Sequence, residues 1–117
     1  MFDYKAIVDR VVDGDTIKVT ISLGFGISYK ETVRFADIDA YETSLRRGTT
    51  EAQKVIGLEG KQFLKELLEG KEVLLTTHKD KGKYGRYVAD VCINIDNKEV
   101  NVNQQMVKDG YAVYKSY

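Results

Sequence analysis

Asp15-Thr-Ile-Lys-Val-Thr-Ile-Ser22 alternates polar and apolar side chains from Thr16 onward, directly after the pair Asp13-Gly14. Alternation of period two is typical of a half-buried β-strand, and an Asp-Gly pair is typical of a tight turn. The three isoleucine and valine side chains therefore face one side of this strand. Because Asp15 has the same parity as these apolar residues, we expect its carboxylate to point inward where the strand begins.

The neighbouring segments predict four more strands. Residues 4–12 are rich in β-branched side chains, and Gly24-Phe25-Gly26 marks a turn into a third strand over residues 28–38. These three strands are joined by short turns, as in a meander. Residues 73–77 and 86–95 predict two further strands around a loop at 79–85.

Two helices are expected between and after these strands. Thr50 and Gln53 have the spacing of a capping box, and Gly70 is placed to end a long helix. Gly60 shares a stripe with the apolar residues of that helix and would allow close packing against a sheet. The stripe consists of Ala52, Val55, Ile56, Phe63, Leu64, Leu67 and Leu68. A short helix near residues 102–109 ends at Gly110.

This order of elements predicts an α+β class, mainly β, in a single domain over residues 1–117. Five strands with one long and one short helix are compatible with the five-stranded OB-fold, a Greek-key barrel often used for oligonucleotides. The late tyrosines Tyr111, Tyr114 and Tyr117 are expected to cap the core of so small a barrel, with Tyr84 as an exception that faces a ligand.

The composition restricts the class of function. Hydrophobic residues make up 43% and charged residues 31% of the 117 residues, as in ordinary globular domains. The formal net charge is zero, so any affinity for a polyanion must come from local clusters of Lys and Arg. One cysteine, Cys92, and one histidine, His78, are too few for a Cys/His zinc centre.

The chain as given predicts a cytoplasmic monomer without a membrane partner, with a secreted or released form as the alternative. Near its N-terminus there is no apolar run of the length that a signal or membrane segment needs.

Five scattered charged residues make a metal and phosphate site plausible: Asp15, Arg34, Asp39, Glu42 and Arg86. Carboxylates suit a hard divalent cation, and one of them could accept a proton from an attacking water. Guanidinium groups bind phosphate oxygens bidentately. Plainer interpretations remain open, because acids beside turns are often only solvated turn residues, and Arg86 could pair with Asp80 or Asp90.

The spacing adds one condition on the third strand. Strict alternation places Arg34 and Asp39 on opposite faces, so the strand must bend or end between them if both border one site.

Three segments resemble the successive signature segments of the staphylococcal nuclease (thermonuclease) family. They are Val12-Asp-Gly-Asp-Thr-Ile-Lys18, Arg34-Phe-Ala-Asp-Ile-Asp-Ala-Tyr-Glu42 and Lys83-Tyr-Gly-Arg86. The resemblance covers almost the whole chain. It implies a five-stranded OB barrel that hydrolyses DNA and RNA with calcium, by attack of water, and leaves 3′-phosphorylated ends.

The resemblance also implies a role for each matching residue. Asp15 and Asp39 would bind calcium together with the backbone carbonyl of Ala40, and Glu42 would activate the attacking water. Arg34 and Arg86 would hold the scissile phosphate and stabilise the charge of the transition state. The residues expected to contact a neighbouring phosphate are Lys83 and Tyr84.

Two departures from the family pattern bear on these roles. Ala40-Tyr41 stands where the family usually has Thr-Pro, and Gly82 where an aspartate is common. A carbonyl ligand survives a change of side chain, but the loss of proline could loosen the loop that carries Glu42 and lower the rate. The alternative function is a catalytically idle OB-fold module that binds single-stranded nucleic acid or a protein partner, and the retained charges argue against it.

Overall fold

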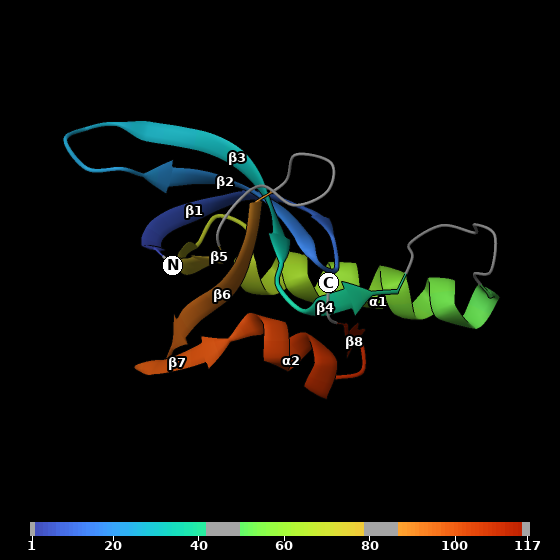
Figure 1. Cartoon of the computed structure of the whole chain (residues 1–117). Helices are drawn as coiled ribbons and strands as arrows, with labels where there is room; N and C mark the ends of the chain where they lie inside the picture. The colour runs from blue at the N-terminus through green and yellow to red at the C-terminus, as the bar shows by residue number, and fades with distance from the viewer. Residues whose placement is uncertain (1, 42–49, 79–86, 116–117) are drawn as a thin grey trace.

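A closed barrel of five strands forms the centre of the molecule (Figure 1). The computed structural model describes residues 2–41, 50–78 and 87–115. The barrel strands are β1 (Phe2–Asp13), β2 (Thr16–Ser22), β3 (Ser28–Phe35), β5 (Glu72–His78) and β6 (Tyr87–Ile95). They follow one another in the order β3-β2-β1-β5-β6. Parallel pairing of β3 with β6 joins the two ends and closes the sheet. The predicted OB-fold barrel of the α+β class is confirmed.

Three short strands were not predicted as separate elements. They are β4 (Ile38–Ala40), β7 (Lys98–Asn101) and β8 (Ala112–Tyr114). β7 extends the barrel sheet from β6, and β4 pairs with β8 in a separate two-stranded sheet. The single strand expected over residues 28–38 is wrong in one respect: β3 ends at Phe35, because Asp37 takes up a left-handed backbone with φ 60°.

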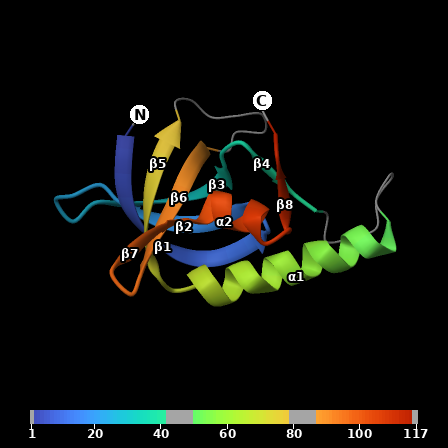
Figure 2. The same ribbon diagram turned by 90° about the horizontal axis from the view of Figure 1, so that it is seen from below.

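Two helices cover the barrel (Figures 1 and 2). Helix α1 (Glu51–Leu68) lies against β1, and α2 (Val102–Lys108) lies against β6. The predicted capping box of Thr50 and Gln53 is present, and Gly70 follows the helix with φ 77°. Both helix predictions are therefore confirmed to within two residues. No helix in the described part of the chain is long and apolar enough to cross a membrane.

The core lies inside the barrel and under the two helices. Its largest fully buried side chains come from four strands and both helices: Phe35, Ile17, Ile38, Leu64, Leu68, Leu75 and Met106. The outer turns of α1 extend beyond the barrel (Figure 2), so Ala52 and Val55 of the predicted stripe are exposed. Buried positions in α1 begin only at Gly57, where the helix meets the rest of the molecule.

Gly60 is packed against the segment that leads into β8 rather than against the barrel sheet. A Cβ atom on Gly60 would lie 2.9 Å from the Cβ of Tyr111, closer than real Cβ atoms approach one another. The ring of Tyr111 in turn packs on Phe63, with 5.3 Å between the ring centroids. The absence of a side chain at position 60 thus sets the distance between α1 and the C-terminal segment.

We expect Gly60→Ala to lower the free energy of unfolding by up to about 2 kcal/mol. The added methyl overpacks this contact at a cost of about 1–3 kcal/mol, and the gain of about 1 kcal/mol that alanine has over glycine inside a helix offsets part of that cost. Urea denaturation measures the difference, with the exposed neighbour Glu59→Ala as the control. A Gly60→Ala protein more stable than the wild type would show that the helix is free to move away.

Candidate active site

The break between β3 and β4 brings three of the predicted site residues together. Arg34 lies near the end of β3, Asp15 directly precedes β2, and Asp39 lies in β4. The backbone N–H of Phe35 donates to the carbonyl of Asp15 at 2.8 Å, which joins the two strands at this point. The turn at Asp37 then reverses the parity of the chain. Arg34 and Asp39 therefore face one site, and the strand ends between them, which is the condition that strict alternation had set.

The Arg34 guanidinium lies between backbone carbonyls and carboxylates. Its Nη1 donates to the carbonyls of Ile38 at 3.1 Å and Phe35 at 3.4 Å. Its Nη2 donates to Asp39 Oδ1 at 3.2 Å and Asp15 Oδ2 at 3.4 Å. Both carboxylate contacts are longer than the roughly 2.7–2.9 Å of a strong charge-assisted hydrogen bond. The two carbonyl contacts cover the same range of distances, so all four contacts together orient the guanidinium and none of them is short.

Asp15 is the most buried acid of the site, with 11% of its side chain exposed. Its Oδ2 also accepts a hydrogen bond from the N–H of Ala40 at 2.9 Å, and its Oδ1 accepts one from the Thr16 hydroxyl at 2.9 Å. Gly14 permits this approach, because a Cβ there would lie 3.0 Å from the Cβ of Ala40. The inward position predicted from strand parity is confirmed.

Asp39 is more open, with 40% of its side chain exposed. Its second oxygen, Oδ2, lies 3.6 Å from the Nζ of Lys115. Lys115 was not predicted as part of the site, because 76 positions separate it from Asp39 and no motif joins them. Only the pairing of β4 with β8 brings Lys115 to this edge of the site.

The oxygen atoms of this site suit a hard divalent cation. A carboxylate offers about four lone pairs, and the named contacts of Asp15 and Asp39 use three and two of them. Two carboxylates and a backbone carbonyl are ligands that calcium prefers, with waters completing the shell. Within the described ranges, no cluster of three or more His, Cys, Asp or Glu side chains offers a richer metal site.

Four of the predicted site residues lie outside the described residues: Glu42, Lys83, Tyr84 and Arg86. Their positions relative to the Asp15 carboxylate therefore remain predictions. For Ala40 the structure places the backbone N–H on Asp15, whereas the predicted role concerns its carbonyl oxygen.

Asn103 holds the chain segment between Arg34 and Asp39 in place, and the sequence analysis did not predict this role. It is 3% exposed, its Oδ1 accepts from the N–H of Val91 at 2.9 Å, and its Nδ2 donates to the carbonyls of Ala36 at 3.0 Å and Ala89 at 3.2 Å. The carbonyl of Ala36 begins the turn that carries the chain into β4. No sequence signal pointed to it, because Asn103 is the second residue of α2 and asparagine is common near the start of a helix.

Other polar residues of the chain have structural roles. His78 ends β5 and lies 2.9 Å from Asp90 Oδ2, as expected for a polar residue at the end of a strand. Burial raises the pKa of the Cys92 thiol to about 11, so this residue is protonated at neutral pH and is a poor nucleophile. Tyr111 packs on the core as predicted, but Tyr114 is 65% exposed and that prediction is wrong. Tyr117 lies outside the described residues.

Comparison with known proteins gives a consistent result. The family model described as staphylococcal nuclease homologue matches residues 32–117, more than half of the chain. The chain is 34% identical to an uncharacterised protein of Methanocaldococcus jannaschii over 93% of its length, 35% identical to endonuclease YhcR of Bacillus subtilis over 94%, and 31% identical to micrococcal nuclease of Shigella flexneri over 98%. It spans 58%, 9% and 61% of these relatives, respectively.

Proposed function

The chain belongs to the family of staphylococcal nuclease homologues, and from that membership we propose that it is a calcium-dependent nuclease that hydrolyses DNA and RNA and leaves 3′-phosphorylated ends. The observation that carries this proposal is the Arg34 guanidinium, held between Asp15 and Asp39 at the break between β3 and β4. A cation and two carboxylates at one point can hold a phosphate and a metal together. Relatives named endonuclease and nuclease support the same activity.

The described residues would bind and orient the reacting phosphate. Asp15 and Asp39 would hold calcium, with the carbonyl of Ala40 as a further ligand. Calcium held by these residues would supply positive charge that polarises the reacting phosphate. Arg34 would turn its Nη2 from the carboxylates toward the phosphate, while its Nη1 stays on the carbonyl of Ile38. Its fixed charge would then stabilise the negative charge that grows on the phosphate in the transition state.

The remaining roles are assigned by motif. Glu42 follows β4 by two positions and would accept a proton from the attacking water. Arg86 would share the phosphate with Arg34, and Lys83 and Tyr84 would contact the next phosphate along a single strand. Tyr41, which stands where the family has proline, donates its N–H to the carbonyl of Tyr111 at 3.4 Å. This bond continues the pairing of β4 with the C-terminal segment by one residue, up to the position before Glu42.

The test is hydrolysis of single-stranded DNA with calcium, with magnesium and with a chelator. We expect cleavage only with calcium, and a loss of rate of about 10²–10³-fold in Arg86→Ala and at least about 10²-fold in Glu42→Ser. Lys108→Ala, an exposed change on α2, is the matched control. Cleavage that persists in chelator, or that is unaffected by both substitutions, would contradict the proposal. Calcium-assisted binding of a nucleotide bisphosphate without cleavage would instead favour the idle binding module.

A further inference from the structure

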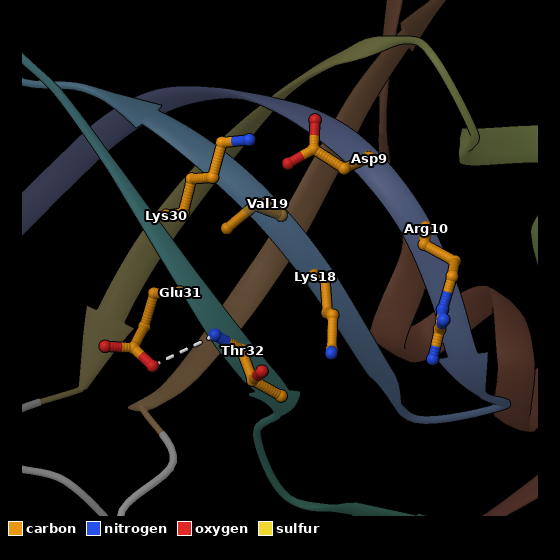
Figure 3. Close-up of a pocket in the computed structure, with 7 residues that line it drawn as sticks. All are labelled: Asp9, Arg10, Lys18, Val19, Lys30, Glu31 and Thr32. Atoms are coloured by element: carbon orange, nitrogen blue, oxygen red, sulfur yellow. Dashed lines mark hydrogen bonds between the residues drawn. The ribbon is translucent and has the colours of Figure 1, made fainter.

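A shallow groove crosses β1, β2 and β3 on their outer side (Figure 3). Its volume is about 430 Å³, and it lies apart from the Asp15 and Asp39 carboxylates. Three cationic side chains line it: Arg10 from β1, Lys18 from β2 and Lys30 from β3. All three are exposed. Two acids, Asp9 and Glu31, also line the groove, so three cations exceed two acids there, whereas the net charge of the whole chain is zero.

Two of these cations lie directly opposite one another. Arg10 of β1 pairs in register with Lys18 of β2, and Figure 3 shows both side chains extending in the same direction. Cβ atoms of opposite residues in an antiparallel pair lie about 4.5–5.5 Å apart, and like charges there are destabilising. Lys30 lies on the same face, because its partner Thr20 is two residues beyond Lys18. The fold thus keeps an unfavourable cluster that a bound anion would relieve.

The two acids of the groove, Asp9 and Glu31, form their hydrogen bonds with hydroxyl and backbone donors rather than with these cations. Asp9 accepts a hydrogen bond from the Thr20 hydroxyl at 2.7 Å, and Glu31 accepts from the N–H of Thr32 at 3.0 Å and the hydroxyl of Tyr29 at 3.0 Å. Among the residues that the structure describes, none forms an ion pair within 4.0 Å of the three cations. Asp9 and Arg10 both face outward because a β-bulge interrupts β1 between Val8 and Arg10.

The groove continues into the candidate active site along the same two strands. Thr32, which lines the groove, pairs with Lys18, and the next residue on that face of β3 is Arg34, which pairs with Thr16. Two residues along a strand span about 6.6 Å, which is close to the distance between neighbouring phosphates of an extended single strand. A nucleic-acid strand held by Arg34 can therefore extend over Lys18 toward Lys30.

We propose that Arg10, Lys18 and Lys30 form a second binding site for the phosphate backbone of a single-stranded nucleic acid, outside the reacting centre. This inference rests on the proposed function, because it places part of the same strand. The site would bind phosphates without reading the bases, since cationic side chains contact the backbone of a nucleic acid and carry no information about its sequence. It would make binding of long substrates stronger and more dependent on salt than binding of short ones.

The experiment compares two double variants in chelator, where binding is measured without cleavage. Lys18→Gln/Lys30→Gln removes two charges from the groove, and Lys98→Gln/Lys108→Gln removes two exposed charges from β7 and α2. Fluorescence anisotropy with single-stranded DNA of about ten nucleotides gives the dependence of affinity on salt. We expect the slope of log K against log salt, which is negative, to become shallower by about 1.4 in the groove variant. Each phosphate contact with a single strand contributes about 0.7 to the steepness of that slope.

The remaining outcomes separate this inference from the nuclease proposal. A trinucleotide should bind the groove variant and the wild type equally, because it ends within the reach of Arg34. A ten-nucleotide slope equal to that of the control variant would overturn the groove, even if the wild type cleaves DNA. A groove-dependent slope without any cleavage would leave the groove in place and refute the nuclease. Equal, groove-dependent binding of a polyglutamate peptide would overturn the assignment to nucleic acid.

Discussion

Arg34→Ala is expected to lower kcat for calcium-dependent cleavage of single-stranded DNA by about 10²–10³-fold, the usual effect of removing a group that stabilises transition-state charge. Two backbone carbonyls orient the Arg34 guanidinium, at 3.1 Å and 3.4 Å from its Nη1. Alanine removes both the charge and the forked donors. Quenched-flow or fluorogenic cleavage assays at saturating DNA measure this loss directly.

Arg34→Lys is the matched control for charge. Lysine keeps a positive charge but cannot reproduce the planar fork, so most of the loss should remain. Binding of terbium, as a luminescent substitute for calcium, supplies a second measurement without substrate. Because Arg34 lies 3.2 Å and 3.4 Å from the carboxylates of Asp39 and Asp15, its removal should not weaken terbium binding. A folded Arg34→Ala protein that cleaves within about threefold of the wild type would refute the phosphate role.

Asn103→Ala is expected to lower the free energy of unfolding by about 2–4 kcal/mol, since it leaves buried backbone groups without a partner at about 1–3 kcal/mol each. The N–H of Val91 loses its 2.9 Å bond and the carbonyl of Ala36 loses its 3.0 Å bond. The carbonyl of Ala89 loses less, because the N–H of Ala36 still donates to it at 2.8 Å. Urea denaturation followed by circular dichroism measures the change.

Two further variants make this prediction specific. Gln104→Ala, at the next and exposed position of α2, should change stability by less than about 0.5 kcal/mol. Asn103→Asp should be at least as damaging as Asn103→Ala, because it replaces the donating Nδ2 by an oxygen that faces two carbonyl oxygens. If Asn103→Ala had the same free energy of unfolding as the wild type, water would be replacing the side chain as a hydrogen-bond partner. The same variant should also lose cleavage rate, because the turn after Ala36 positions Asp39.

Much of the fold followed from local pattern. Alternation in β2, the capping box at Thr50 and the glycine at position 70 act over a few residues, and all three are present in the structure. The missed strands β7 and β8 are four and three residues long, too short for a period to show. The exposed turns of α1 were also missed. An apolar stripe shows which face could be buried, but not how far the barrel extends beneath it.

The site divides in the same way. Local sequence placed Asp15 on the inner side of β2, and the family segments identified Arg34, Asp39 and Ala40 as its partners. Arg34 and Asp39 face one site because Asp37 has a left-handed backbone. Strand alternation showed that the strand must be interrupted between them, but it did not show at which residue. Lys115 and Asn103 reach the site through pairing of β4 with β8 and through packing of α2 on β6.

The sequence by itself therefore determined the barrel class, the helix ends and the identity of the charged residues, because these depend on period, caps and motif within short stretches. Only the tertiary structure decided that Arg34 lies between two carboxylates and that Arg10, Lys18 and Lys30 share one groove. The physical reason is that register and closure of the sheet are set by long-range pairing. A shift of one residue in that pairing would place every one of these side chains on the opposite face.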